Sequence, residues 1–302
     1  MAQPDTVQGL VVAAHGRHYM VELADGTVRQ CFPRRKRSEA AVGDQVIVTP
    51  AGADEGTIEK ILERRNLLYR SDEMRTKQFA ANVDQLLIVV ATEPAFSDDL
   101  TGRALVAART SGIAPIIVLN KADITTKLAD ARERLRWAID LEVPVIELVA
   151  VDENATRDTL LPVLDGKCNL LLGQSAMGKS TILNALVPNA QAATQEHSRA
   201  LGAGKHTTTT TRLYHLPEPY QGSIIDSPGF QSFGLHHLDD DDIRYGFPEF
   251  SMAPQPCRFS DCSHRHEPGC SVQELLEAGK IAPQRYALYT RLLQEHETKN
   301  PW

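Results

Sequence analysis

The 302-residue sequence predicts a multidomain α/β protein with a small β-barrel, a parallel sheet covered by helices, and a C-terminal helical segment around a metal site. Three observations predict it. Short strand patterns separated by turns fill the first 68 residues. From about residue 80, buried strands alternate with helices, which is typical of a parallel sheet covered on both faces. After residues 239–242 the strand patterns stop, and three cysteines lie between Cys257 and Cys270.

Composition and charge exclude some classes of protein. With 42% hydrophobic and 24% charged residues, the chain has the composition of a soluble globular protein. No apolar run approaches the roughly 20 residues that cross a bilayer, and residues 1–5 lack a secretory pattern. We therefore expect a cytoplasmic protein with no membrane partner. The net charge of −7 argues weakly against a general nucleic-acid coat, but it leaves room for a local basic face. Disulfides are not expected, and Cys31 and Cys168 are most simply core or strand residues.

The N-terminal region, residues 1–68, has the pattern of a closed barrel of the oligonucleotide-binding (OB) type, although SH3-like barrels look similar in sequence. Its expected strands are residues 9–12, 18–23, 42–48 and 56–61, with a hairpin turn at 24–27. The basic run at residues 34–37 lies in a loop of this barrel, and Arg64, Arg65 and Arg70 follow its last strand. These cations favour contacts with RNA phosphates, but a charge run can also be a solvated loop.

Residues 69–238 form the expected α/β region. Its predicted strands are residues 83–90, 114–119, 143–148, 168–172 and 222–225, and its predicted helices are 99–112, 127–140 and 181–186.

The segment Gly173–Ser180 matches the phosphate-loop pattern G-x-x-x-x-G-K-[ST], between an apolar strand and a helix as that motif requires. Its backbone N–H groups can surround phosphates with the help of the helix N-terminus. Lys179 would neutralise β- and γ-phosphate charge, and the Ser180 hydroxyl would ligate Mg²⁺. The predicted nucleotide contacts here are Gly173, Gln174, Ser175, Ala176, Met177, Gly178, Lys179, Ser180 and Thr181.

Asn120, Lys121, Ala122 and Asp123 form an N-K-x-D element at the end of a predicted strand, where ligands dock on open α/β sheets. The Asp123 carboxylate can accept hydrogen bonds from the N1–H and N2–H₂ groups of guanine, a donor pair that adenine lacks. Asn120 can bond the base and tie this loop to the phosphate loop.

Asp226–Gly229 follows the last predicted strand. Asp226 would hold Mg²⁺ through a water molecule, and the Gly229 N–H would sense a γ-phosphate. The next residue is Phe230, where many GTPases place a glutamine that orients the attacking water, so catalysis needs another group or a partner. Thr207 and Thr208, in the stretch 202–211, can complete the Mg²⁺ shell. His206 is the nearby candidate for polarising water, although it is equally well a surface histidine.

The base-recognition element precedes the phosphate loop, and Asp226–Gly229 follows it. In an ordinary small GTPase the phosphate loop comes first, so this order indicates a circularly permuted GTPase.

The C-terminal region, residues 239–302, contains Cys257, Cys262, His264 and Cys270, which is the ligand set of a structural Zn²⁺ site with no position left open for catalysis. His266 is a spare candidate ligand. Zinc would hold together a segment too small to bury its own core. Helical patterns follow near residues 272–278 and 283–297, and the acidic run 239–242 is either a hinge or a helix start.

Taken together, these motifs resemble the bacterial circularly permuted GTPases that act in late maturation of the small ribosomal subunit, over nearly the whole chain. The hallmarks are residues 80–85, 120–123, 173–180, 204–208, 226–229 and 257–270. The resemblance implies a monomer with an OB barrel, a permuted GTPase domain and a domain with one structural zinc. It also implies that the protein binds the small (30S) subunit and its rRNA, and hydrolyses GTP to GDP and phosphate with Mg²⁺, stimulated by the subunit.

Two positions depart from the family pattern. Ala176 stands where the family usually has glycine, so the loop must either avoid positive φ or accept strain. Val149-Ala150 replaces an expected Ser-Ala pair, where the Ala150 N–H could approach the guanine carbonyl oxygen. The family is thought to use the histidine that matches His206 in hydrolysis. Two alternatives remain, an RNA-binding scaffold that holds GTP as a structural ligand and, less consistent with the motifs, a small-molecule kinase.

Overall fold

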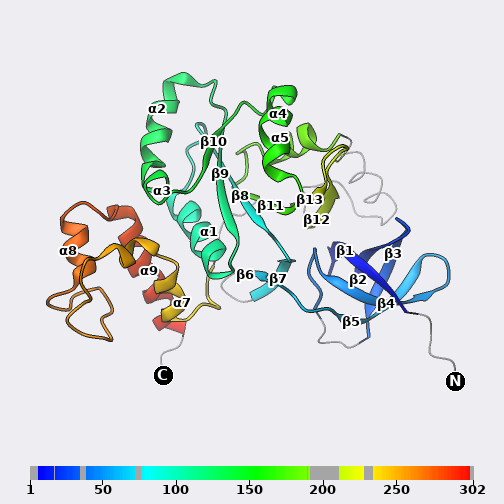
Figure 1. The fold of residues 1–302 in the computed structure, drawn as a ribbon, viewed down its shortest axis with the longest axis horizontal. Helices are drawn as coiled ribbons and strands as arrows, with labels where there is room; N and C mark the ends of the chain where they lie inside the picture. Colours follow the sequence, from blue (N-terminus) through cyan, green and yellow to red (C-terminus); the bar gives the residue numbers. More distant parts are fainter. Residues whose placement is uncertain are drawn as a thin grey trace.

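The computed structural model describes residues 6–16, 18–34, 39–71, 76–188, 190, 211–227 and 234–299. Figure 1 shows three parts along the long axis of the molecule. A β-barrel lies at one end, a sheet flanked by helices lies in the middle, and the C-terminal helices lie at the other end. The central part therefore contacts both of the others.

The barrel contains five strands in the order β1-β2-β3-β5-β4, and β1 closes it by pairing with β4. Val11, Val21, Cys31 and Val46 point inward and are fully buried, and this burial raises the pKa of the Cys31 thiol to about 11. The closed five-stranded arrangement is OB-like and confirms the predicted barrel. The strands are β1 (Val7–His15), β2 (His18–Leu23), β3 (Val28–Pro33), β4 (Gln45–Ala51) and β5 (Glu55–Ile61).

A hairpin of β6 (Leu67–Ser71) and β7 (Thr76–Ala81), which the sequence analysis did not predict, connects the barrel to the central sheet. Arg64 joins the barrel to this hairpin, because its guanidinium lies 2.7 Å from both carboxylate oxygens of the fully buried Asp44 and also bonds Gln78 of β7. Arg64, one of the predicted phosphate contacts, is thus taken up by contacts within the protein.

The central sheet has the strand order β10-β9-β8-β11-β13-β12. All neighbouring strands in it are parallel except β12, which is antiparallel to β13. Helices α1–α3 cover one face and α4 and α5 cover the other (Figure 1). β12 also meets β1 of the barrel, at Ala13 and Arg212.

The bounds of most central elements agree closely with the predicted ones. The single helix predicted at residues 127–140 is instead two helices, α2 and α3, which are separated at Leu135, and α4 and β12 were not predicted. The strands are β8 (Gln85–Ala91), β9 (Ala114–Asn120), β10 (Val145–Glu147), β11 (Lys167–Gly173), β12 (Arg212–His215) and β13 (Gly222–Asp226). The helices are α1 (Asp98–Thr110), α2 (Thr125–Arg134), α3 (Arg136–Asp140), α4 (Glu153–Leu164) and α5 (Lys179–Leu186).

The C-terminal part contains α7 (Asp240–Tyr245), the 3₁₀ helix η1 (Pro248–Met252), α8 (Ser271–Glu277) and α9 (Pro283–Lys299). Asp239 caps α7 in a reciprocal capping box with Asp242, so the acidic run is a helix start and not a hinge.

Helix α9 packs against α1. A Cβ atom on Gly102 would lie 2.4 Å from Leu288, so the two helices approach closely only because residue 102 is glycine. Arg103 of α1 is nearly buried and bonds both Asp99 and Glu295, and Arg291 bonds Asp99 at 2.6 Å. These contacts join the C-terminal part to the central sheet through α1.

Candidate nucleotide and metal sites

The phosphate loop connects β11 to α5, as its motif requires. Gly178 has φ +97°, and a Cβ atom at that position would lie 2.0 Å from the Asn120 side chain, so only glycine fits there. Gly173 is equally constrained, because its Cβ would lie 2.4 Å from the Val89 carbonyl oxygen. Both glycines of the motif are therefore required by the backbone path.

Lys179 is folded back onto the loop. Its Nζ donates hydrogen bonds to the carbonyl oxygens of Gly173 at 2.6 Å and Gln174 at 2.9 Å. Burial lowers the pKa of this ammonium, and the negative charge of Asp226 partly opposes that shift. The ammonium is held where a nucleotide phosphate could replace the two carbonyl oxygens as its partner.

The sequence left open whether the loop avoids a positive φ at Ala176 or accepts the strain. Ala176 has φ +67°, so the loop accepts the strain. A non-glycine residue in this left-handed region costs roughly 1 to 2 kcal/mol. The nucleotide loop thus carries backbone strain at a residue that has no side-chain function of its own.

Asn120 ties the base-recognition element to the phosphate loop, as the sequence predicts. Its Nδ2 donates to the Met177 carbonyl oxygen at 2.9 Å, and its Oδ1 accepts from the N–H groups of Lys121 and Ala150 at 2.8 and 3.0 Å. Asn120 is 2% exposed. The Ala150 N–H, a candidate contact for the guanine oxygen, is therefore bonded to Asn120 in this structure.

Lys121 is held in a left-handed conformation, with φ +60°. Its carbonyl oxygen accepts from the Thr92 hydroxyl at 2.8 Å, and its Nζ donates to the Glu93 carbonyl oxygen at 2.7 Å. These contacts fix the turn that leads to Asp123.

A hollow of about 500 Å³, open to solvent, lies beside this turn. It combines a carboxylate with apolar side chains, which suits a flat base with polar edges. Its lining residues are Asn120, Lys121, Asp123, Ile124, Val149, Ala150, Val151, Gly178 and Thr181. The structure thus brings Asp123 and the first turn of α5 to the same hollow.

Asp226 ends β13, and Lys179 follows β11, the next strand of the sheet. Asp226 is 7% exposed, and burial raises its pKa to about 6, although Lys179 and the Ser227 N–H oppose the shift. Ser227 fixes the start of the following segment through a 2.7 Å hydrogen bond to the Leu171 carbonyl oxygen. A buried carboxylate beside a cation is suited to a metal bound to phosphates.

Four predicted site residues lie outside the part of the chain that the structure describes. They are His206, Thr207, Thr208 and Gly229.

The C-terminal part holds the predicted metal ligands together. The ligand atoms of Cys257, Cys262, His264 and Cys270 all lie within 4.8 Å of one another. His264 Nδ1 is 3.5 Å from the sulfurs of Cys257 and Cys270, which are 4.0 Å apart. A zinc tetrahedron with bonds of about 2.3 Å to sulfur and 2.0–2.1 Å to nitrogen has edges of about 3.5–3.8 Å. The cluster therefore fits structural zinc, and His266, the spare candidate, is not part of it.

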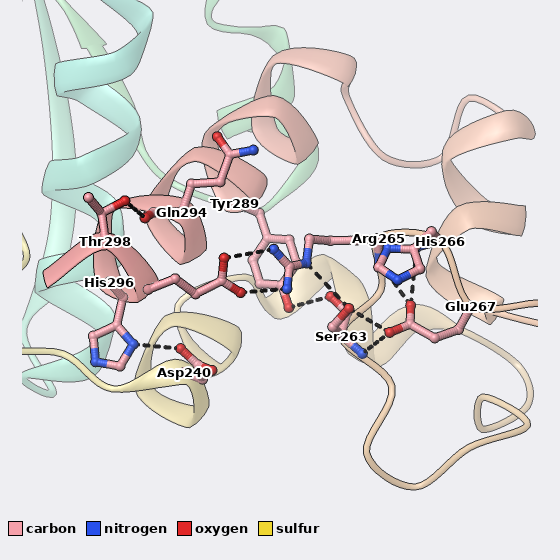
Figure 2. A network of polar contacts seen from close by, with 10 residues as sticks. Asp240, Ser263, Arg265, His266, Glu267, Tyr289, Gln294, His296 and Thr298 are labelled. Atoms are coloured by element: carbon pink, nitrogen blue, oxygen red, sulfur yellow. Dashed lines mark hydrogen bonds and ion pairs between the residues drawn. The ribbon is translucent and has the colours of Figure 1, made fainter. Parts of the chain in front are cut away.

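A network of hydrogen bonds supports the ligand loop (Figure 2). The Glu267 carboxylate accepts from the Ser263 N–H and hydroxyl and from the backbone N–H groups of Arg265 and His266. Tyr289 donates to the Ser263 carbonyl oxygen at 3.0 Å. These groups organise the chain on both sides of His264.

Two further contacts hold this loop to α9. Tyr286 donates to the His264 carbonyl oxygen at 2.6 Å, and Arg265 bonds both carboxylate oxygens of Glu297. Sequence analysis predicted the helix that carries Tyr286 and Tyr289, but it did not identify Glu267. The only sequence signal for Glu267 is that it is a carboxylate inside a cysteine-rich loop.

Sequence analysis also missed Gln174 as a link between elements. Its Oε1 accepts from the N–H of Ser97, the N-cap of α1, at 2.7 Å. The phosphate loop is thereby tied to the helix on which the C-terminal part packs.

Comparisons with known proteins agree with this geometry. A family model described as RsgA GTPase matches residues 61–236. The small ribosomal subunit biogenesis GTPase RsgA of Bordetella pertussis (strain Tohama I) is 62% identical over 295 residues, covering 98% of each chain. The protein of the same name from Ralstonia nicotianae (strain GMI1000) is 52% identical over 297 residues, covering 97% of this chain and 93% of its own.

Two solved structures also match over almost the full length. The crystal structure of YjeQ from Thermotoga maritima superposes with a TM-score of 0.73 at 30% identity, covering 97% of this chain and 99% of its own. YloQ, titled a circularly permuted GTPase, superposes with a TM-score of 0.70 at 25% identity, covering 98% and 96%. These matches confirm the predicted fold class. In the part of the chain that the structure describes, no helix is long and apolar enough to cross a membrane.

Proposed function

Because the chain belongs to the RsgA GTPase family, we propose that it binds the small (30S) ribosomal subunit and hydrolyses GTP to GDP and phosphate during late maturation of that subunit. The observation that carries this proposal is the meeting of three separate motifs at one edge of the sheet. Asn120 bonds the phosphate loop, Asp123 lines the adjacent hollow, and Asp226 lies near Lys179. The names of the relatives supply the small subunit as partner.

In this proposal the loop from Gly173 to Thr181 holds the phosphates through its N–H groups. The Lys179 ammonium exchanges the carbonyl oxygens of Gly173 and Gln174 for the phosphates, whose charge it neutralises. Asp123 recognises the guanine edge. Ser180 would ligate Mg²⁺ and Asp226 would hold it through a water molecule, and the ion would supply charge neutralisation at the phosphates. A nearby cation would favour the Asp226 carboxylate, which burial disfavours.

By their positions in the sequence, Thr207 and Thr208 complete the metal shell, Gly229 senses the γ-phosphate, and His206 acts on the attacking water. Phe230 cannot orient water, so we propose that the small subunit stimulates hydrolysis by positioning His206 or by supplying a missing group. Partner-supplied groups in other GTPases contribute factors of about 10³–10⁵.

We propose three domains, at residues 1–68, 69–238 and 239–302. The first would contact ribosomal RNA, and the third would hold one structural zinc through Cys257, Cys262, His264 and Cys270. In the permuted order the chain runs from Asp226 directly into the third domain, so loss of the γ-phosphate would be transmitted to that domain. We propose that the protein acts as a monomer in the cytoplasm, where bacterial subunits mature.

The test is steady-state GTP hydrolysis by the pure protein, alone and with purified small or large ribosomal subunits. The proposal expects strong stimulation by small subunits and much less by large ones, and it expects His206→Ala to remove the stimulated rate. Phe230 favours one alternative, an RNA-binding scaffold that holds GTP without turnover. Tight GTP binding with no hydrolysis on either subunit would establish that alternative and overturn the proposal.

A further inference from the structure

The barrel and the central domain form one continuous sheet, and β12 is the strand at which they join. Each residue of β12 pairs with a residue of β13, and β12 also meets β1 of the barrel, where Ala13 lies opposite Arg212. Arg212 lies opposite Asp226 as well, at the end of β13. A row of paired residues therefore runs from Ala13 of the barrel through Arg212 to the residue that we propose for holding Mg²⁺.

A second contact between the barrel and β12 lies at the other end of that strand. His215 Nε2 is 2.8 Å from a carboxylate oxygen of Glu22, which belongs to β2 of the barrel. β12 has four residues, so its two ends lie about 10 Å apart, at about 3.3 Å per residue. No motif of the nucleotide site or of the metal site uses this pair.

The space beside these contacts is only partly filled. A groove of about 620 Å³ lies between the two domains, and its walls include Met20 of the barrel and Val187 and Tyr214 of the central domain. Next to Ala13, by contrast, the domains are packed, because the buried Val12 belongs to the same hydrophobic cluster as the core of the central domain. A packed contact beside an open groove is the arrangement expected of a hinge.

We infer that Glu22 and His215 are positioning residues that form a latch, which holds the barrel against β12 and transmits subunit binding at the barrel to Asp226. The inference rests on the proposed function, in which the barrel contacts ribosomal RNA and Asp226 holds Mg²⁺. A turn of the barrel that keeps the latch displaces β12, and the pairing of β12 with β13 carries that displacement to Asp226. Without the latch the barrel turns about the packed contact at Val12, and β12 keeps its place.

The exposure of the pair suits a reversible contact. The His215 side chain is 57% exposed and the Glu22 side chain is 26% exposed, and ion pairs this exposed contribute little to the stability of a fold. The pair between Arg132 of α2 and Glu147 of β10 has nearly the same exposures, 56% and 32%, but it lies within the central domain. It therefore supplies a matched control.

The test measures GTP hydrolysis by the full-length protein at varied concentrations of small subunits and of Mg²⁺. His215→Ala should lower kcat at saturating subunits about fivefold or more, as for typical coupling between two sites, and raise the Mg²⁺ concentration that gives half the maximal rate. The basal rate and the subunit concentration for half-maximal stimulation should not change. Glu22→Ala should have the same effect, and the double variant should lose no more than either single variant. Arg132→Ala should behave like the unaltered protein.

Full stimulation of His215→Ala would overturn the inference, as would additive losses in the double variant. An unchanged kcat with a higher subunit concentration for half-maximal stimulation would also overturn it, because Glu22 and His215 would then bind the subunit directly. A lowered kcat without any change in the Mg²⁺ requirement would refute the route through Asp226.

Hydrogen exchange of backbone amides tests the latch without subunits. In the nucleotide-free protein, His215→Ala should speed exchange in residues 212–215, because the barrel then leaves the outer edge of β12 more often, and Arg132→Ala should not. Unchanged exchange in His215→Ala would overturn the latch even where subunits stimulate hydrolysis. If subunits do not stimulate the unaltered protein, the proposed function fails, while faster exchange in His215→Ala still supports the latch.

Discussion

Asp226→Asn should stabilise the nucleotide-free protein and at the same time weaken its Mg²⁺-dependent binding of GTP. Burial raises the pKa of Asp226 from an ordinary value of 3.8 to about 6, which means that the fold disfavours the carboxylate at neutral pH. An amide of the same shape removes the buried charge. It also removes the group that we propose for holding the metal.

The size of the effect follows from the pKa. A displacement from 3.8 to about 6 corresponds to about 3 kcal/mol at neutral pH. This is an upper value, because the substitution also removes the attraction that Asp226 exerts on the buried Lys179 ammonium. We therefore expect the free energy of unfolding to rise by roughly 1 to 2 kcal/mol.

The raised pKa of Asp226 also determines the direction in which stability changes with pH. Between pH 4 and 6 the native carboxyl binds a proton that the unfolded chain has released, so the contribution of Asp226 to stability falls as the pH rises through this range. Urea unfolding at several pH values, without nucleotide, should show this trend in the unaltered protein and lose it in Asp226→Asn.

Asp84→Asn is the matched control, with the opposite sign. Burial raises the pKa of Asp84, but hydrogen bonds from Arg65 and from the Cys168 N–H, together with nearby charges, outweigh it and leave that pKa lowered. Its stabilising contribution is present at neutral pH and is lost as the pH falls, so Asp84→Asn should destabilise. If Asp226→Asn also destabilises at pH 7, the view of Asp226 as a disfavoured buried carboxylate is wrong.

Three further predictions concern the loops and the metal. Ala176→Gly should raise the free energy of unfolding by up to about 1 kcal/mol because it relieves the positive φ. By contrast, Ala129→Gly on the exposed side of α2 should lower the free energy of unfolding by about 1 kcal/mol. If urea unfolding shows that both variants lose the same free energy, Ala176 is not strained. Asp123→Asn should weaken GTP binding and admit xanthosine triphosphate, and an unchanged base preference in competition binding would contradict the guanine contact. Cys270→Ser should lower the bound zinc below one per chain by elemental analysis and expose residues 239–302 to proteolysis, whereas full zinc content would contradict its role as a ligand.

Local chemistry was enough to predict the parts of the site that a motif specifies. The phosphate loop requires a strand before it and a helix after it, and β11 and α5 supply both. The bond from Asn120 to the phosphate loop was predicted because the carboxyl ends of parallel strands meet at one edge. The sequence left the conformation of Ala176 open, because a loop backbone depends on contacts from its surroundings.

The elements that sequence reasoning missed depend on distant partners. β12 has four residues, and it is a strand because it pairs with β13 on one side and meets β1 of the barrel on the other. β3 has no regular alternation of apolar and polar residues, and it is held in the middle of the barrel by pairing with β2 on one side and β5 on the other. Helix α4 contains Pro162 near its end and buries only four side chains against its neighbours. None of these pairings leaves a periodic pattern that is strong enough to predict the element by itself.

The permuted order gives the nucleotide site two physical connections to the C-terminal domain. One is covalent, because the chain leaves β13 at Asp226 and reaches α7 within a few residues of Leu235. The other passes through α1, whose N-cap is held by Gln174 of the phosphate loop and whose Gly102 face packs against α9. A helix of 13 residues is about 20 Å long and moves as a rigid rod. A displacement of the phosphate loop that keeps the Gln174 bond would move α1, and with it α9 or the close packing at Gly102. This is the physical route by which we propose that nucleotide state reaches the C-terminal part.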